Sequence, residues 1–192
     1  TLFNKTMTIA SAEANAQVSS GYDFKPYKVI TDIGGGHGSL LRAVLATTVD
    51  NNGIVFDLPH VVEEGKKGAN ADLNGRVEFQ GGDFFQTIPH GSDLYMMKWI
   101  IHDWNDEKSL IILKNVRQAM KETSKLLIID SVVKSGNDFE PAKFMDLNMM
   151  VLVSGKERSR LEFEQLLSRS GFKLNHIYNE ESRFAILECL PE

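Results

Sequence analysis

A glycine-rich turn between a short apolar run and a helix-like segment constrains this chain more than any other feature. Residues 29–33 (VITDI) are mostly β-branched and apolar, and residues 34–38 (GGGHG) follow directly. An open α/β sheet uses such a strand, turn and helix to bring its backbone close to a nucleotide-like ligand. Glycine suits this turn because it has no Cβ to block a ligand and tolerates positive φ. The feature predicts an α/β fold with a ligand at the turn, although a plain tight turn would have the same composition.

The spacing of the glycines favours S-adenosylmethionine over a dinucleotide. A dinucleotide fingerprint has the form G-x-G-x-x-G, whereas Ser39 occupies the third glycine position here. The loop instead has the form D-x-G-x-G-x-G, from Asp32 to Gly38. S-adenosylmethionine is a nucleoside with an amino-acid tail and no phosphate, so it suits a loop that departs from the pyrophosphate pattern.

Length and composition narrow the classes of protein further. A chain of 192 residues predicts one domain, with room for a small appendage. The net charge of -5 argues against nucleic acid or an anionic membrane as a partner, and no apolar run approaches the ~20 residues of a membrane span. Cys189 is the only cysteine, which excludes a disulfide framework and fits a reducing, cytoplasmic setting.

Strand-like and helix-like segments alternate along most of the chain. We expect a leading helix over residues 1–19, strands at 29–33, 54–57, 77–80, 93–101 and 125–130, and helices at 39–48, 58–69, 106–120, 144–153 and 160–170. Two further strands, 173–178 and 184–190, are expected to form a closing hairpin. This order predicts a doubly wound, Rossmann-like α/β sheet that is mostly parallel, with an antiparallel last strand.

Polar residues follow several of these strands, at the edge where a doubly wound sheet binds its ligand. Asp57 lies nineteen positions after Gly38, a distance at which an acid can accept hydrogen bonds from ribose hydroxyls, or can simply cap the next helix. Asp83 and Phe84 follow the third strand and combine an acceptor with an aromatic face, as an adenine ring requires. A turn acid and a core aromatic residue would look the same.

His102 follows the fourth strand and is the candidate general base. Histidine is the side chain best suited to take a proton near neutral pH, and it needs an acceptor to orient its other ring nitrogen. Asp130 or Glu157 is expected to supply that acceptor. The alternatives are a histidine at a helix entry, with Asp103 as the cap, and a metal site formed by His102, Asp103 and Asp106. The metal site is disfavoured because no second histidine is nearby.

Five motifs in this order resemble the S-adenosylmethionine-dependent small-molecule O-methyltransferases, typified by the plant caffeic acid enzymes and the animal hydroxyindole enzyme. They are residues 32–38 (DIGGGHG), 56–61 (FDLPHV), 81–85 (GGDFF), 97–104 (MKWIIHDW) and 155–158 (GKER). The resemblance extends over about residues 3–190. It implies a class I methyltransferase fold and S-adenosylmethionine as the cofactor, with S-adenosylhomocysteine as the product.

The resemblance also implies roles for individual residues. The cofactor would be held by Asp32, Gly34, Gly36, Asp57, Leu58, Asp83, Phe84 and Lys98, with Trp104 close to it. His102 would remove the proton from an acceptor hydroxyl, flanked by the carboxylates of Asp130 and Glu157. The positions at which relatives line the acceptor pocket are Phe3, Asn4, Met7, Met145, Met149 and Met150, which could equally be ordinary core residues. Methionine suits such a pocket because its flexible thioether can clamp an aromatic ring.

The chain departs from the family pattern at three points. Asp130 stands where the plant enzymes usually have glutamate, so its reach toward His102 is shorter by one methylene. His37 replaces a residue that is commonly threonine. Family members also carry a helical N-terminal domain that dimerises and completes the acceptor pocket. We therefore expect residues 1–20 to be a leading helix from the connection to such a domain, and residues 21–192 to be the catalytic domain.

These observations predict a metal-independent O-methyltransferase that acts on a small molecule with an aromatic or enolic hydroxyl. No nucleic acid or membrane partner is expected, and the full-length form is expected to be a homodimer. Two alternatives remain open at this point. One is an NAD(P)-dependent oxidoreductase, against which Ser39 and the His-Asp-Trp sequence argue. The other is a catalytically silent cofactor-binding domain, which the departure at Asp130 favours and the intact His102 and Glu157 oppose.

Overall fold

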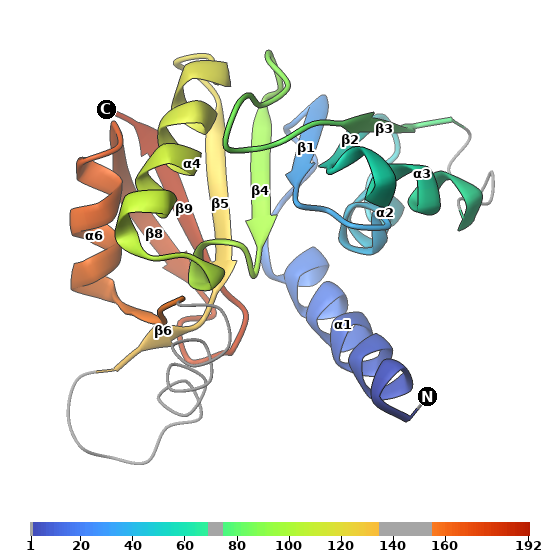
Figure 1. Cartoon of the computed structure of the whole chain (residues 1–192), viewed down its shortest axis with the longest axis horizontal. Coiled ribbons are helices and arrows are strands. Elements are labelled where there is room, and N and C mark those ends of the chain that lie inside the picture. Colours follow the sequence, from blue (N-terminus) through green and yellow to red (C-terminus); the bar gives the residue numbers. More distant parts are fainter. Residues whose placement is uncertain (1, 69–74, 135–154) are drawn as a thin grey trace.

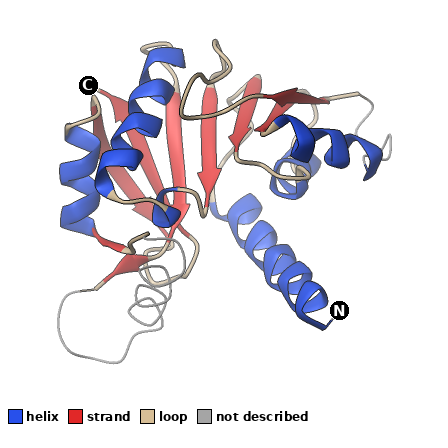
Figure 2. Cartoon of the chain, viewed as in Figure 1, coloured by secondary structure: helices blue, strands red, loops and turns tan. Residues whose placement is uncertain are grey.

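The computed structural model describes residues 2–68, 75–134 and 155–192, with side chains from residue 12 onwards. Its centre is a seven-stranded sheet of order β3-β2-β1-β4-β5-β9-β8 (Figures 1 and 2). The strands are β1 (Val29–Ile33), β2 (Asn52–Asp57), β3 (Val77–Gly81), β4 (Leu94–Lys98), β5 (Lys125–Asp130), β8 (Phe172–Tyr178) and β9 (Ala185–Pro191). The helices are α1 (Leu2–Gly21), α2 (Ser39–Ala46), α3 (Pro59–Gly68), α4 (Asp106–Ala119) and α6 (Arg160–Ser168).

The sheet is parallel except at one strand, as the sequence predicts. β1 pairs in parallel with β2 and β4, and β4 pairs in parallel with β5. β9 is antiparallel to both of its neighbours, β5 and β8. The chain proceeds outward from β1 to β3 and then returns to place β4 on the other side of β1. Strand order reverses between β1 and β4, and open α/β sheets bind their ligands at such a point.

Helices cover both faces of the sheet because its inner strands are apolar on both sides. In β5, Leu126 and Ile128 face the core packed with α4 and α6, whereas Leu127 and Ile129 face the core packed with α1 and α2. Asn105 caps α4 by accepting a hydrogen bond from the amide of Lys108. In Figure 1, α1 begins away from the sheet, near the end marked N, and runs toward the carboxyl ends of β1 and β4.

The main error in the predicted elements lies at the fourth strand. The expected strand 93–101 ends at Lys98, because Trp99 adopts a positive φ of 56° and turns the chain. A short 3-10 helix, η1 (Ile101–Asp103), follows and carries His102. The expected helix 39–48 is also shorter and ends at Ala46.

A small second sheet escaped prediction because each of its strands has two residues. It consists of β6 (Val132–Val133) and β7 (Arg158–Ser159), which pair in parallel. β6 continues from the end of β5, so this sheet brings residues 157–158 beside Asp130. The predicted helix 144–153 lies outside the described residues. No helix in the described part of the chain is both long and apolar enough to cross a membrane.

Candidate functional site

The glycine turn after β1 has the conformation that its composition predicts. Gly34, Gly36 and Gly38 all have positive φ, at 68°, 57° and 76°. At Gly36 a β-carbon would meet no atom within 4 Å, so this part of the turn borders open space. The amide of Gly36 donates a hydrogen bond of 2.8 Å to Asp57 Oδ2. The carboxylate at the end of β2 thus helps to shape the turn at the end of β1.

A pocket of about 650 Å³ lies over this turn. It contains four of the predicted cofactor residues, which are Asp32, Gly34, Gly36 and Lys98. The remaining lining residues are Ala12, Asn15, Gly35, His37, Ser39, Leu40, Val61 and Trp99. The pocket therefore combines the turn, the ends of β1 and β4, and α1. His37, noted above as a departure from the family pattern, lies at the exposed side of the pocket, 3.8 Å from Glu64.

Two titratable side chains face this pocket, the buried Asp32 and the half-buried Lys98. The Asp32 side chain is buried, and within the described residues its Oδ2 atom has no hydrogen-bond partner. Burial raises the pKa of Asp32 to about 7, although the charge of Lys98 opposes this change. Lys98 Nζ donates to Asn15 Oδ1 at 2.7 Å, and burial lowers the pKa of the ammonium group. A buried carboxylate oxygen without a donor favours a cationic, hydrogen-bond-donating ligand group.

The other five predicted cofactor residues do not line this pocket; they are Asp57, Leu58, Asp83, Phe84 and Trp104. Asp57 Oδ1 accepts a hydrogen bond from the amide of Leu58, and Asp83 Oδ1 accepts one from the amide of Phe85. Asp83 therefore takes part in its own turn, as one of its two interpretations stated, whereas Asp57 bonds the amides of its neighbour Leu58 and of Gly36 in the glycine turn. Each carboxylate oxygen still has lone-pair capacity for a ligand.

The aromatic residues form a cluster next to the pocket. Phe84 packs against Phe85 with ring centroids 4.9 Å apart, and against Trp104 at 6.3 Å. A β-carbon at Gly34 would lie 3.9 Å from the Phe84 ring, which places this cluster beside the glycine turn. Phe84 and Trp104, which the resemblance associates with the same ligand, are thus brought together.

Three carboxylates lie close to the imidazole ring of His102. Its Nδ1 atom is 2.9 Å from Glu157 Oε1 and 3.9 Å from Asp130 Oδ1, and its Nε2 atom is 3.4 Å from Asp103 Oδ1. The imidazole side chain is 13% exposed, and the side chains of Glu157 and Asp130 are each 1% exposed. Glu157 is therefore the hydrogen-bonded partner. Asp130 is beyond hydrogen-bond distance, consistent with the shorter reach expected of aspartate.

The surrounding charges alter how His102 titrates. Burial lowers the pKa of the ring, but the hydrogen bond to Glu157 and the charges of Asp130, Glu157 and Asp103 outweigh burial and raise the pKa to about 9. Burial raises the pKa of the Asp130 carboxyl to about 7, while the charge of His102 opposes this change. In the alternative metal arrangement the third ligand would be Asp106, whose Oδ1 is bound by Arg158. Among the described residues no group of three such side chains is arranged to hold a metal.

Trp99, which was not among the predicted site residues, lies between the pocket and His102. Trp99 lines the pocket, and its ring is nearly parallel to that of His102, at 6.5 Å between centroids and 20° between planes. Its positive φ is rare for a bulky residue and indicates a constrained position. A tryptophan within an apolar run carries no sequence signal for such a conformation. Asn15 was also missed, because its contact with Lys98 joins residues far apart in sequence.

No side chain of the predicted acceptor-pocket residues is described by the structure. Met145, Met149 and Met150 lie outside the described residues, and the side chains of Phe3, Asn4 and Met7 lie outside the described part of α1. Their role remains a prediction.

Comparisons with known proteins match this chain to O-methyltransferases. A family model described as "O-methyltransferase domain" matches residues 1–173. The phenazine O-methyltransferase PhzM of Lysobacter antibioticus is 38% identical over 191 residues, which covers 99% of this chain and 56% of that protein. The mitomycin biosynthesis 6-O-methyltransferase of Streptomyces lavendulae is 41% identical over 177 residues, which covers 90% of this chain and 50% of that protein. The chain spans about half the length of the curated relatives it matches.

A solved structure extends this likeness to a protein with bound ligands. The O-methyltransferase NcsB1 from neocarzinostatin biosynthesis was solved in complex with S-adenosylmethionine and 2-hydroxy-5-methyl naphthoic acid. It matches with a TM-score of 0.87 and 28% identity, and the match covers 99% of this chain and 57% of that one.

Proposed function

This chain belongs to the O-methyltransferase domain family, and we propose that its protein methylates a hydroxyl group of a small aromatic or enolic molecule. In this proposal S-adenosylmethionine is the methyl donor, His102 is the general base and no metal takes part. The observation that carries the proposal is the position of His102. It lies 2.9 Å from a buried carboxylate, and its ring is nearly parallel to that of Trp99, which lines the pocket at the glycine turn.

The residues around the pocket fit S-adenosylmethionine. Asp32 offers a buried carboxylate oxygen to the ammonium group of the amino-acid tail, and the open space at Gly36 lets the backbone approach the ligand. Asp57, at the end of β2, would accept hydrogen bonds from the ribose. Phe84 and Trp104 offer aromatic faces to adenine, with Asp83 and Leu58 beside them. When bound, the cofactor supplies an electrophilic methyl group on a positively charged sulfur atom.

The chain's own contribution to the chemistry is to accept a proton at one nitrogen. A carboxylate can only accept a hydrogen bond, so His102 Nδ1 donates to Glu157 Oε1 and leaves Nε2 as the basic atom. The acceptor's O–H bond breaks, its proton moves to Nε2, and its electron pair remains on the oxygen that receives the methyl group. Glu157, Asp130 and Asp103 then stabilise the imidazolium that has formed. Holding the acceptor near the base supplies the proximity part of the rate enhancement.

The raised pKa of His102 predicts a rate that increases with pH. With a pKa of about 9 in the free protein, only about 1% of the rings are neutral at pH 7, and only the neutral ring can take a proton. We expect kcat/KM to rise about tenfold per pH unit from pH 7 and to level off near pH 9. The measurement is the pH profile of methyl transfer to 2-hydroxy-5-methyl naphthoic acid, whose own hydroxyl pKa is determined separately. A profile that levels off near pH 6.5 would contradict this account.

The cofactor is tested by a thermal melt of this chain with S-adenosylmethionine, S-adenosylhomocysteine, NAD or NADP. A ligand at 100 times its Kd stabilises the folded state by about 2.7 kcal/mol, which is a rise in Tm of roughly 5–10 °C for a chain of this length. We expect the rise with the two sulfur nucleosides only. Asp32→Asn should reduce the rise, whereas Asp50→Asn, an exposed control, should preserve it. A rise with NAD or NADP alone would favour the oxidoreductase alternative.

The silent-domain alternative makes a different prediction. A chain that binds S-adenosylmethionine but transfers no methyl group to any of a panel of phenols, naphthols and enols would support it. The division into residues 1–20 and 21–192 and the homodimeric state remain predictions, which limited proteolysis and light scattering of the longer protein would test.

A further inference from the structure

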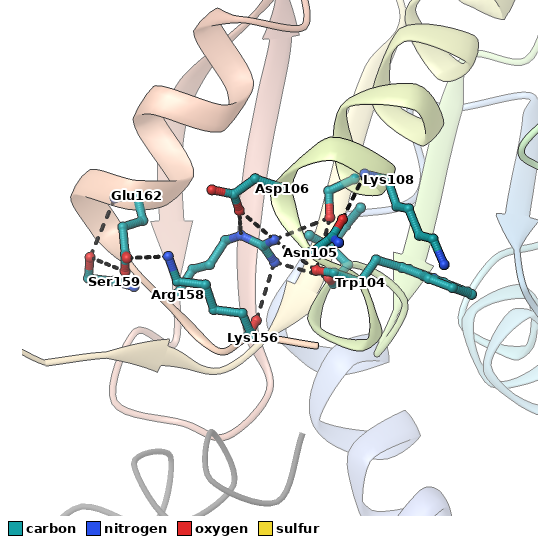
Figure 3. A network of polar contacts seen from close by, with 10 residues as sticks. Trp104, Asn105, Asp106, Lys108, Lys156, Arg158, Ser159 and Glu162 are labelled. Atoms are coloured by element: carbon teal, nitrogen blue, oxygen red, sulfur yellow. Dashed lines mark hydrogen bonds and ion pairs between the residues drawn. The ribbon is translucent and has the colours of Figure 1, made fainter. Parts of the chain in front are cut away.

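Arg158 is the largest side chain that is fully buried in the described part of the chain, and its role is not explained by the chemistry above. It is 1% exposed and lies on β7, one residue after Glu157. Its guanidinium group makes six polar contacts, and every one of its N–H-bearing nitrogens takes part (Figure 3). A buried arginine is stable only when its donors are satisfied in this way.

The contacts of Arg158 enclose the segment that carries His102. Nη1 donates to the carbonyl oxygen of Ile101 at 3.0 Å, and Nη2 donates to that of Trp104 at 2.9 Å. These two carbonyls stand on either side of His102 in the chain. Asp106 Oδ1, at the start of α4, accepts from Nε at 3.1 Å and from Nη2 at 2.8 Å. Nη2 also lies 3.2 Å from Ser109 Oγ, one turn further along α4.

The same guanidinium group is anchored to the segment that carries Glu157. Nη1 donates to the carbonyl oxygen of Lys156 at 3.2 Å, and the amide of Lys156 donates to the carbonyl oxygen of His102 at 2.8 Å. At Gly155 a β-carbon would lie 2.1 Å from that same His102 oxygen, so the two segments meet where only glycine fits. Arg158 therefore bonds both to the segment that carries His102 and to the segment that carries Glu157.

We propose that Arg158 is a positioning residue that holds the His102 segment and the Glu157 segment in register, so that the base keeps its carboxylate partner. The inference rests on the proposed role of His102 as the base. Arginine suits this task and lysine does not, because a planar guanidinium group presents five donors in a fixed arrangement, whereas an ammonium group presents three. The carbonyls of Ile101, Trp104 and Lys156 and the carboxylate of Asp106 are shared among Nε, Nη1 and Nη2, whereas an ammonium group has a single nitrogen to serve them all.

The test compares Arg158→Lys and Arg158→Met with Arg160→Met. Arg160 is the matched control because it lies two residues later, is 61% exposed and, within the described residues, forms its ion pair with Glu164 on the same helix. The first readout is the pKa of His102 in the full chain, measured by an NMR titration of the ring C–H signals. The signals of His102 are assigned by their loss in His102→Gln. The second is kcat and KM for methyl transfer to 2-hydroxy-5-methyl naphthoic acid, and the third is the Kd of S-adenosylhomocysteine.

We expect both Arg158 variants to lower the pKa of His102 from about 9 toward its usual value near 6.5, because Glu157 is no longer held at 2.9 Å. kcat should fall about 10- to 100-fold, as is typical when a reacting group is displaced by about 1 Å. KM and the Kd of S-adenosylhomocysteine should change far less than kcat. Arg160→Met should match the wild type in all three measurements.

The inference is overturned if a folded Arg158→Lys keeps both the wild-type pKa of His102 and the wild-type kcat, whatever happens to its Tm. If neither Arg158 variant folds, Asp106→Asn and Ser109→Ala remove two of the guanidinium partners singly and are held to the same criteria. If the wild type methylates none of the hydroxyl compounds tested, the proposed function fails. The NMR titration of His102 still decides the role of Arg158 in that case.

Discussion

Replacing His102 with glutamine is expected to lower kcat by about 10²- to 10⁴-fold, the usual contribution of a general base. Glutamine has nearly the reach of histidine, but it cannot take a proton at neutral pH. S-adenosylhomocysteine should still bind with a Kd close to that of the wild type, because His102 is not among the residues that line the pocket at the glycine turn. The measurements are single-turnover methyl transfer and calorimetric titration with S-adenosylhomocysteine.

His90→Gln is the matched control for this experiment. His90 is exposed in the connection between β3 and β4, and its substitution should change neither kcat nor Kd. Wild-type turnover in His102→Gln would show that another group takes the proton, or that the acceptor loses it to water. Loss of S-adenosylhomocysteine binding would instead indicate that His102 supports the cofactor site.

Replacing Glu157 with glutamine should have the second-largest effect. Glu157 is the carboxylate in hydrogen-bond contact with His102, at 2.9 Å, and its side chain is 1% exposed. A neutral amide cannot stabilise the imidazolium that forms in the reaction, and its NH₂ group can turn toward Nδ1 and favour the wrong tautomer. Loss of the corresponding carboxylate in a catalytic triad costs about 10⁴-fold, so we expect a fall in kcat of about 10²- to 10⁴-fold.

The Glu157 prediction includes a change in the pH profile and a comparison with the second acid. The hydrogen bond and charge of Glu157 help to raise the pKa of His102. Glu157→Gln should therefore move the rise in kcat/KM to lower pH as well as reduce its plateau. Asp130→Asn should have a smaller effect on both, because Asp130 lies 3.9 Å from Nδ1. Equal effects of the two substitutions would contradict the unequal roles that these distances assign.

A related measurement tests the departure from glutamate at residue 130. Asp130→Glu would extend this carboxyl group by one methylene toward His102 Nδ1, and a second hydrogen-bonded acid should raise the pKa of the ring further. Such a change would show that aspartate keeps the second carboxylate at a distance from the base.

Most of the fold follows from local sequence patterns. β1 and β5 have their predicted bounds, Asn105 caps α4, and the chain ends in the antiparallel pair β8 and β9. These features were accessible because a buried parallel strand is a continuous apolar run and a helix start has a capping residue, and both signals lie within a few residues. The order of the elements then places the ends of β1, β2, β4 and β5 at one edge of the sheet. The candidate pocket and His102 both lie at that edge, so their approximate location could be predicted from the order of the elements.

The arrangement within the site required the folded chain. The sequence left open whether Asp130 or Glu157 orients His102, and the separation of 3.9 Å against 2.9 Å depends on how β5 and residues 155–158 pack against η1. The positive φ of Trp99 and the reach of Arg158 to Ile101 and Trp104 arise in the same way. The contacts of His102 and Arg158 join residues that are 28 to 57 positions apart in the sequence, so a local sequence pattern cannot predict their distances. The residue types at the strand ends therefore indicated the chemistry proposed here, whereas long-range packing set which carboxylate lies in hydrogen-bond contact with His102 and which arginine bonds the backbone on either side of it.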